Sequence, residues 1–218
     1  MGLFDRFKKA QEPEETEDLP ALGWDAVTAR FEELYPDQPN PQHIGTLVSY
    51  RFGGDDPLDG VSIYDGGGFW HFVTYGFSDM YNKETEDPEW SGWGFELTVK
   101  LKKLPWIDEM ELKNIVGVLQ GLARYVYGSG RGFLPYQYIW TQQTEGFDLN
   151  GKTKLTGFAT LTDEAGLIET PNGKVEFICV VGLTDKELRS IVDKQYTTEE
   201  ILEKLGSPLT DYERDEVV

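Results

Sequence analysis

The hydrophobic residues of this chain follow two different periods, which predict two kinds of element. Between Phe95 and Leu101 every second residue is apolar, a pattern typical of a half-buried β-strand. The run Phe69–Tyr75 is mostly aromatic or β-branched and predicts a strand covered on both faces. Apolar residues recur at helical spacing from Trp24 to Leu34 and from Leu112 to Val126, which predicts two amphipathic helices.

Weaker patterns fill in the rest of the folded part. The pair Asn172-Gly173 is typical of a hairpin turn. Gly117 and Gly121 lie in the second long helix, where each glycine costs about 1 kcal/mol relative to alanine, so we expect close packing against another element there. Further strands are predicted at residues 44–52, 61–64, 134–141, 153–162 and 175–181, and short helices at residues 185–192 and 198–205.

Composition divides the chain into one folded domain and two tails. Residues 1–20 are predicted to form a flexible N-terminal tail and acidic linker, because residues 11–20 hold five acids, two prolines and no base. The folded domain is predicted to span residues 21–206, and residues 207–218 to form a loose acidic tail. The first ten residues combine Leu3, Phe4 and Phe7 with basic neighbours, which leaves a weak membrane contact open.

The charge balance narrows the set of partners. A formal net charge of −19 repels nucleic acid and anionic membranes and attracts a basic protein or peptide, although solubility alone also accounts for it. No segment approaches the roughly 18 apolar residues of a membrane span, and no signal peptide is recognisable. The single cysteine, Cys179, allows no internal disulfide and fits a reducing compartment. We therefore expect a cytoplasmic protein.

Candidate catalytic chemistry is limited by the presence of only two histidines, His43 and His71. His71 lies in a predicted strand, and Glu96 lies in another predicted strand beside it. One hypothesis combines these two with Asp65 or Asp79 in a hydrolase-type or metal site. The simpler interpretation is a structural pair of buried polar groups. We predict this structural pair, with no catalytic residue, no metal site and no cofactor.

The loop Ser78–Gly92 is the candidate for binding. It carries five acids against one lysine, and aromatic residues gather around it in the sequence. An aromatic groove with an acidic rim suits a basic or extended peptide, whereas the alternative is a solvated loop above ordinary core aromatics. A strand of the partner added to a free sheet edge is a further route to binding. The predicted binding residues are Tyr64, Asp65, Tyr75, Asp79, Tyr81, Trp90 and Trp93.

Several blocks of the chain resemble one known family in the same order. They are GWDAVTARFEELYPDQPNPQHIGTLV, DPLDGVSIYD, WHFVTYGFSDMY, SGWGFELTVKL and EFICVVGLTDKELRSI, and they are similar to the Suppressor of fused (SUFU) domain family. The resemblance spans roughly residues 22–192. It implies an α+β fold, which we expect to be a mixed or mainly antiparallel sheet with helices packed on it. The chain lacks the extra C-terminal region of the eukaryotic members, so it resembles the single-domain prokaryotic type.

The resemblance also implies a function. Eukaryotic members are regulators that hold a transcription factor through a short peptide, and prokaryotic members are proposed to be immunity proteins. We therefore predict a non-enzymatic protein-binding module, with neutralisation of a bacterial toxin by binding as its sharper form. The alternatives are the hydrolase-type enzyme and a peptide-binding scaffold or regulatory domain unrelated to toxins.

Overall fold

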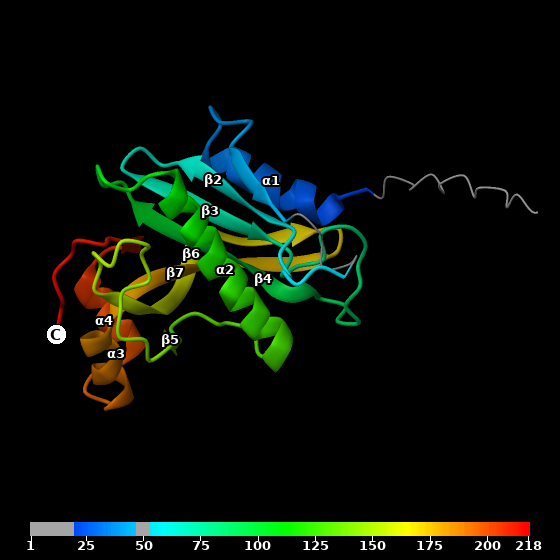
Figure 1. Ribbon diagram of the computed structural model, residues 1–218. Helices are drawn as coiled ribbons and strands as arrows, with labels where there is room; N and C mark the ends of the chain where they lie inside the picture. The colour runs from blue at the N-terminus through cyan, green and yellow to red at the C-terminus, as the bar shows by residue number, and fades with distance from the viewer. Residues whose placement is uncertain (1–19, 47–52) are drawn as a thin grey trace, which may run out of the picture.

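One β-sheet with helices on both faces forms the body of the protein (Figure 1). The computed structural model describes residues 20–46 and 53–218. The helices in these residues are α1 (Leu22–Leu34), α2 (Glu109–Ser129), α3 (Asp185–Val192) and α4 (Thr198–Leu205). The strands are β1 (Gln42–Gly45), β2 (Gly60–Asp65), β3 (Phe69–Tyr75), β4 (Trp90–Lys102), β5 (Tyr138–Trp140), β6 (Leu155–Thr170), β7 (Gly173–Thr184) and β8 (Leu209–Thr210).

The strands follow the order β1-β2-β3-β4-β7-β6-β5, and the short β8 pairs with β4. All neighbours along this order are antiparallel except at the centre, where β4 runs parallel to β7. The alternating run that the sequence shows in β4 therefore lies in the middle of the sheet. A mixed sheet that carries helices confirms the predicted α+β class.

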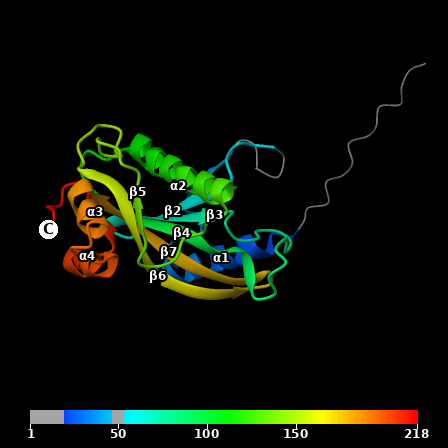
Figure 2. The ribbon, with the colours of Figure 1, turned by 90° about the horizontal axis from the view of Figure 1, so that it is seen from below.

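Each face of the sheet is covered by one long helix (Figure 2). Leu119 of α2 packs in one apolar cluster with Phe72, and Phe31 of α1 packs in the other with Val73. Phe72 and Val73 are neighbours in β3, and successive side chains of a strand point to opposite faces. The sheet is thus buried on both sides. Separately, no described helix is both long and apolar enough to cross a membrane.

Helix α2 begins and ends where its sequence signals predict. The Asp108 side chain accepts hydrogen bonds from the backbone N–H groups of Met110 and Glu111, and Gly130 ends the helix with a φ of 71°. The expectation of close packing at the two interior glycines was wrong. Outside the backbone of α2 itself, a Cβ at Gly117 or Gly121 would meet no described atom within 4 Å, and neither position is buried.

Several strands differ in length from their prediction. β6 runs to Thr170, beyond the predicted end at Thr162, because an irregularity between Thr162 and Leu167 interrupts the pattern without ending the pairing with β7. β5 keeps only three of the eight residues predicted for it. The predicted strand at 44–52 overlaps β1 at Ile44 and Gly45, and its residues 47–52 lie outside the described ones.

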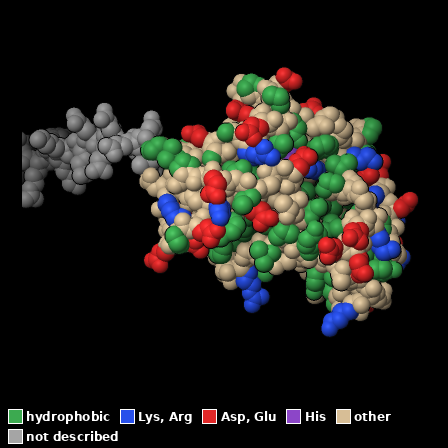
Figure 3. Space-filling model, turned by 180° about the vertical axis from the view of Figure 1, so that it is seen from behind, with side chains coloured by type: hydrophobic (Ala, Val, Ile, Leu, Met, Phe, Trp, Pro, Cys, Tyr) green, Lys and Arg blue, Asp and Glu red, His purple; other side chains and the backbone are tan. Residues whose placement is uncertain are grey.

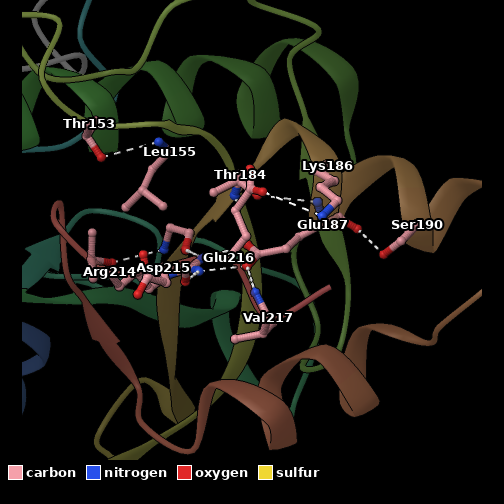
Figure 4. Close-up of polar contacts among 12 residues, drawn as sticks. Thr153, Leu155, Thr184, Lys186, Glu187, Ser190, Arg214, Asp215, Glu216 and Val217 are labelled. Atoms are coloured by element: carbon pink, nitrogen blue, oxygen red, sulfur yellow. Dashed lines mark hydrogen bonds and ion pairs between the residues drawn. The ribbon is translucent and has the colours of Figure 1, made fainter.

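The C-terminal residues are packed onto the fold, so the prediction of a loose tail was wrong. Tyr212 is buried and donates a hydrogen bond to Glu111 at 2.8 Å. Arg214 binds both carboxylate oxygens of Glu187, at 2.6 and 2.5 Å, and the N–H of Val217 donates to the same side chain (Figure 4). The prediction rested on the acidic composition of this segment and did not weigh Tyr212 and Arg214, whose side chains attach it to the fold.

Candidate functional site

A buried polar cluster joins Tyr35, the residue after α1, to β3, β4 and β6. The Tyr35 hydroxyl lies 2.8 Å from Nδ1 of His71. Nε2 of His71 lies 3.3 Å from Oδ2 of Asp163, a close contact without hydrogen-bond alignment. Lys100 forms an ion pair with the same oxygen at 3.2 Å, and Thr98 donates a hydrogen bond to it at 3.0 Å. The side chains of His71 and Asp163 have no exposed surface, so this cluster faces no substrate.

The charges in the cluster stabilise one another. Burial opposes ionisation of Asp163, but the contact with His71 and the charge of Lys100 outweigh it and hold the pKa of this carboxyl well below its usual range. Burial also opposes the charge on Lys100, yet Asp163 and Glu164 raise the pKa of its ammonium group. Structural ion pairs shift pKa values as functional groups do, and the lack of access favours a structural role here.

The same cluster contains the single group of metal-ligand atoms in the described part of the chain. Ligand atoms of His71, Asp163 and Glu164 all lie within 4.8 Å of one another. However, Nζ of Lys100 lies 3.2 Å from Asp163 and 3.1 Å from Glu164. Its ammonium group therefore already supplies the positive charge that a divalent cation would bring to these carboxylates. The residues do not fit a metal centre while Lys100 is charged.

Glu96 is buried as predicted, but it does not pair with His71. Its carboxylate accepts hydrogen bonds from the N–H and the hydroxyl of Ser78, both at 2.8 Å, from the N–H of Gly76 at 3.1 Å and from the Thr74 hydroxyl at 2.6 Å. Burial raises the pKa of Glu96 to about 7, although these hydrogen bonds lower it.

The register of the sheet explains why the predicted pair is wrong. β3 and β4 pair from Phe69 opposite Lys102 to Val73 opposite Thr98. His71 therefore lies opposite Lys100, and Glu96 lies beyond the last pair, where it binds the chain that leaves β3. The partners of His71 come instead from Tyr35 and Asp163, which sequence reasoning missed because both are distant in the chain and carry no motif.

The two aspartates considered for a hydrolase-type site do not approach His71. Asp65 ends β2, is exposed, and contacts Lys103 and the N–H of Gly67. Asp79 accepts hydrogen bonds from the N–H groups of Thr85 and Gly92 within the loop Ser78–Gly92. The set predicted for a hydrolase-type site, His71 with Glu96 and one of these aspartates, is therefore not assembled.

The predicted binding residues separate into three places. Tyr64 and Tyr75 are buried beneath α1, so they offer a partner no surface. Asp65 lies at the opposite end of β3 from the loop Ser78–Gly92. The structure does bring Asp79, Tyr81 and Trp93 together in one pocket of about 280 Å³, while Trp90 is half-buried at the start of β4.

The loop Ser78–Gly92 is held in place from the β6–β7 turn. The Asn172 side chain donates to the carbonyls of Asp79 and Tyr81, at 2.7 and 2.9 Å. Nζ of Lys83 donates to the carbonyls of Trp90 and Asn172, both at 2.7 Å. These contacts fix the backbone of the loop and leave the side chains of Glu84, Glu86, Asp87 and Glu89 exposed.

A second candidate surface lies at the β5 edge of the sheet, where β6 is the single described strand beside β5. Four large hydrophobic side chains in and near this edge are exposed. Exposed fractions reach 49% for Tyr125, 63% for Leu134, 53% for Tyr136 and 44% for Tyr138. Leu134, Tyr136 and Tyr138 are spaced by two residues in the sequence. This period of two is the sequence pattern from which a hydrophobic edge could have been predicted. Tyr125 and Tyr138 line a groove of about 480 Å³, whereas Tyr136 lines a separate pocket with Leu161 and Leu202. The full lining of the groove is Tyr125, Arg131, Gly132, Phe133, Gln137, Tyr138, Ile139 and Trp140.

The backbone on either side of β5 is strained. Tyr136 before the strand has a φ of 62°, and Gln142 after it has a φ of 60°. Residues other than glycine rarely adopt this left-handed backbone conformation, and those that do are concentrated at functional sites. Trp140 at the end of the strand is held by a hydrogen bond from its indole N–H to Asp185 at 3.2 Å. The edge strand is therefore held in a defined conformation.

Comparison with known proteins places this fold. The family model of Suppressor of fused protein (SUFU) matches residues 54–215. The Suppressor of fused homologs of Homo sapiens and Mus musculus are each 33% identical to the chain over 229 residues. These alignments cover 90% of this chain and 44% of each relative, so the chain spans less than half the length of the curated relatives it matches.

Solved structures agree with the sequence match. A structure described as the Sufu-Fu complex has a TM-score of 0.78 and 29% identity, and the match covers 91% of this chain and 93% of that one. The crystal structure of Drosophila Suppressor of Fused has a TM-score of 0.79 and 29% identity, with 91% of this chain and 52% of that one covered. The family match over most of the chain and the shared fold establish that this chain belongs to the Suppressor of fused family.

Proposed function

We propose that this chain is a non-enzymatic protein-binding module that captures an extended segment of a partner at the free edge of β5. The observation that carries this proposal is the group of exposed hydrophobic side chains at that edge, Tyr125, Leu134, Tyr136 and Tyr138. Large exposed apolar patches mark interaction sites, and an edge strand offers unpaired backbone groups to a partner strand. A solved relative described as a Sufu-Fu complex supports a protein partner for this fold.

One pair of leucine substitutions tests the β5 edge. We expect Leu134→Asp to abolish recovery of the partner when the tagged chain is purified from its native host, because a carboxylate would have to be buried against the partner's apolar groups. Leu149→Asp is the matched control, since Leu149 is 57% exposed and is not in the segment that leads into β5. Partners are identified by mass spectrometry at low and at moderate salt. Equal recovery with both variants, or no partner with the unchanged chain, would contradict the proposal.

A second candidate function uses the loop Ser78–Gly92. We propose, as the sharper alternative, a bacterial immunity protein whose loop acids and net charge of −19 draw in a basic toxin. Asp79, Tyr81 and Trp93 would form the contact surface, because they share one pocket. However, on the face shown in Figure 3 acidic side chains are scattered among lysines and arginines, which favours solubility as a further reason for the charge. A scaffold role without a toxin predicts the same binding but no toxin among the recovered proteins.

A further inference from the structure

Arg131 differs from the other arginines in the described part of the chain. Each of the others forms an ion pair with a carboxylate, and Arg131 forms none there; the paired residues are Arg30, Arg124, Arg189 and Arg214. The chain contains 39 acids against 20 lysines and arginines, so carboxylates are abundant. Arg131 is exposed and forms no ion pair with a described carboxylate, although acids are abundant.

The position of Arg131 connects it with the proposed binding edge. It lines the groove of about 480 Å³ beside β5, and it is the only charged residue among those lining this groove. Asp185 accepts a hydrogen bond from the indole N–H of Trp140, which lines the groove, but this carboxylate is already paired with Arg189 at 2.5 Å. A positive charge thus lies in a groove without acids, on a molecule whose net charge is −19.

Apart from Arg131 and the polar Gln137, the side chains that line the groove are aromatic or aliphatic. Tyr125 stacks on Phe133 with ring centroids 5.9 Å apart and an angle of 23° between the planes. Tyr138 and Ile139 continue the lining along β5. Such a surface accepts an apolar side chain of an extended segment, while the planar fork of an arginine matches a carboxylate with two hydrogen bonds.

We propose that the segment captured at β5 carries an acidic side chain and that Arg131 selects for it. This inference rests on the proposed function of the β5 edge. It gives the two candidate surfaces opposite preferences, because the loop Ser78–Gly92 favours a basic partner and the groove at β5 favours an acidic residue within an otherwise apolar segment.

The test uses a phage-displayed library of random short peptides selected on the full chain. Peptides that lose binding on Leu134→Asp, and keep it on Leu149→Asp, are those held at the β5 edge. We expect Asp or Glu to be enriched in them. The strongest binder is then synthesised with its acid and with the corresponding amide, and affinities are measured by fluorescence anisotropy for the unchanged chain and for Arg131→Gln.

We expect Arg131→Gln to weaken the acidic peptide about fivefold, as for an exposed ion pair, and to leave the amide peptide unchanged. Arg131→Glu should weaken the acidic peptide further and favour a version with lysine in place of the acid. Lys194→Gln removes the same charge outside the groove and should have no effect.

The outcomes separate the two proposals. Peptides that depend on Leu134 but show no enrichment of acids, or lose equal affinity for acid and amide forms on Arg131→Gln, overturn the role of Arg131 and leave the β5 edge in place. If no selected peptide depends on Leu134, the binding edge itself fails, and the role of Arg131 fails with it.

Discussion

At the scale of single residues, Glu96 is a buried acid whose ionisation the fold controls. Its pKa of about 7 lies above the ordinary value for a glutamate because burial disfavours the charged form. A carboxyl with a raised pKa stabilises the fold fully below its unfolded pKa, and this stabilisation is lost as the pH rises through the folded pKa. We expect about 3 kcal/mol of unfolding free energy to be lost between about pH 4.5 and 7 through this residue.

Glu96→Gln tests this expectation, because the amide oxygen can still accept the hydrogen bonds of Gly76 and Ser78 but the side chain no longer titrates. Urea unfolding at pH 5 and pH 8 should show a smaller loss of stability with pH in the variant than in the unchanged protein. Glu145→Gln, at an exposed position, serves as the control for the loss of one acid. If the unfolding free energy of Glu96→Gln depends on pH as steeply as that of the unchanged protein, the pKa of the Glu96 carboxyl is not raised into this pH range.

The sequence predicts correctly that His71 and Glu96 are buried, but it does not predict which residues they contact. His71 and Glu96 are both buried, as lone polar residues in apolar strands indicate. Their contacts depend on register and on a β6 irregularity near Asp163, which no local pattern encodes. A strand slip of one residue would have moved His71 to the other face, so such partners follow only from the assembled sheet.

At the scale of elements, a glycine can weaken one element and be required in another. Gly121 lies in the middle of α2, where an added Cβ meets no described atom, whereas Gly92 has a φ of 54° and an added Cβ would lie 2.4 Å from the carbonyl oxygen of Phe77. We expect Gly121→Ala to raise the free energy of unfolding by about 0.5–1 kcal/mol through helix propensity. Gly92→Ala should lower it. Thermal unfolding of both variants measures this, and a destabilised Gly121→Ala would indicate a contact at that position.

Elements with a long, regular pattern could be predicted, and short or irregular ones could not. The helix from Leu112 to Val126 lies within α2, because seven apolar positions and an Asp108 cap agree on one answer. β5 has three residues, so its identity as an edge depends on the order of the whole sheet. The exposed aromatic residues beside β5 have the pattern of ordinary strand residues, whereas the acids of the loop Ser78–Gly92 stand out in the sequence.

At the scale of the whole molecule, the C-terminal segment connects β4, α2 and α3. It begins in β8 against β4, buries Tyr212 against α2, and ends where Arg214 and Val217 bind Glu187 at the start of α3 (Figure 4). Glu187 also completes the capping box of α3 with Thr184. One buried carboxylate thus connects the last residues of the chain to a helix and to the end of β7. The segment therefore contributes to the stability of the domain that presents β5.

Arg214 provides the test of this connection. The Glu187 side chain has no exposed surface and that of Arg214 is 11% exposed, so Arg214→Met leaves a buried carboxylate without its partner. We expect a loss of about 3–5 kcal/mol in urea unfolding. Adding Glu187→Gln, which removes the charge and keeps an oxygen for the helix cap, should restore part of it. Lys186→Met removes an exposed cation of α3 that pairs with Glu216 of the C-terminal segment, and it should cost less than about 1 kcal/mol. Equal effects of Arg214→Met and Lys186→Met would show that the C-terminal segment is attached by its apolar contacts, with Tyr212 rather than the ion pair as its anchor.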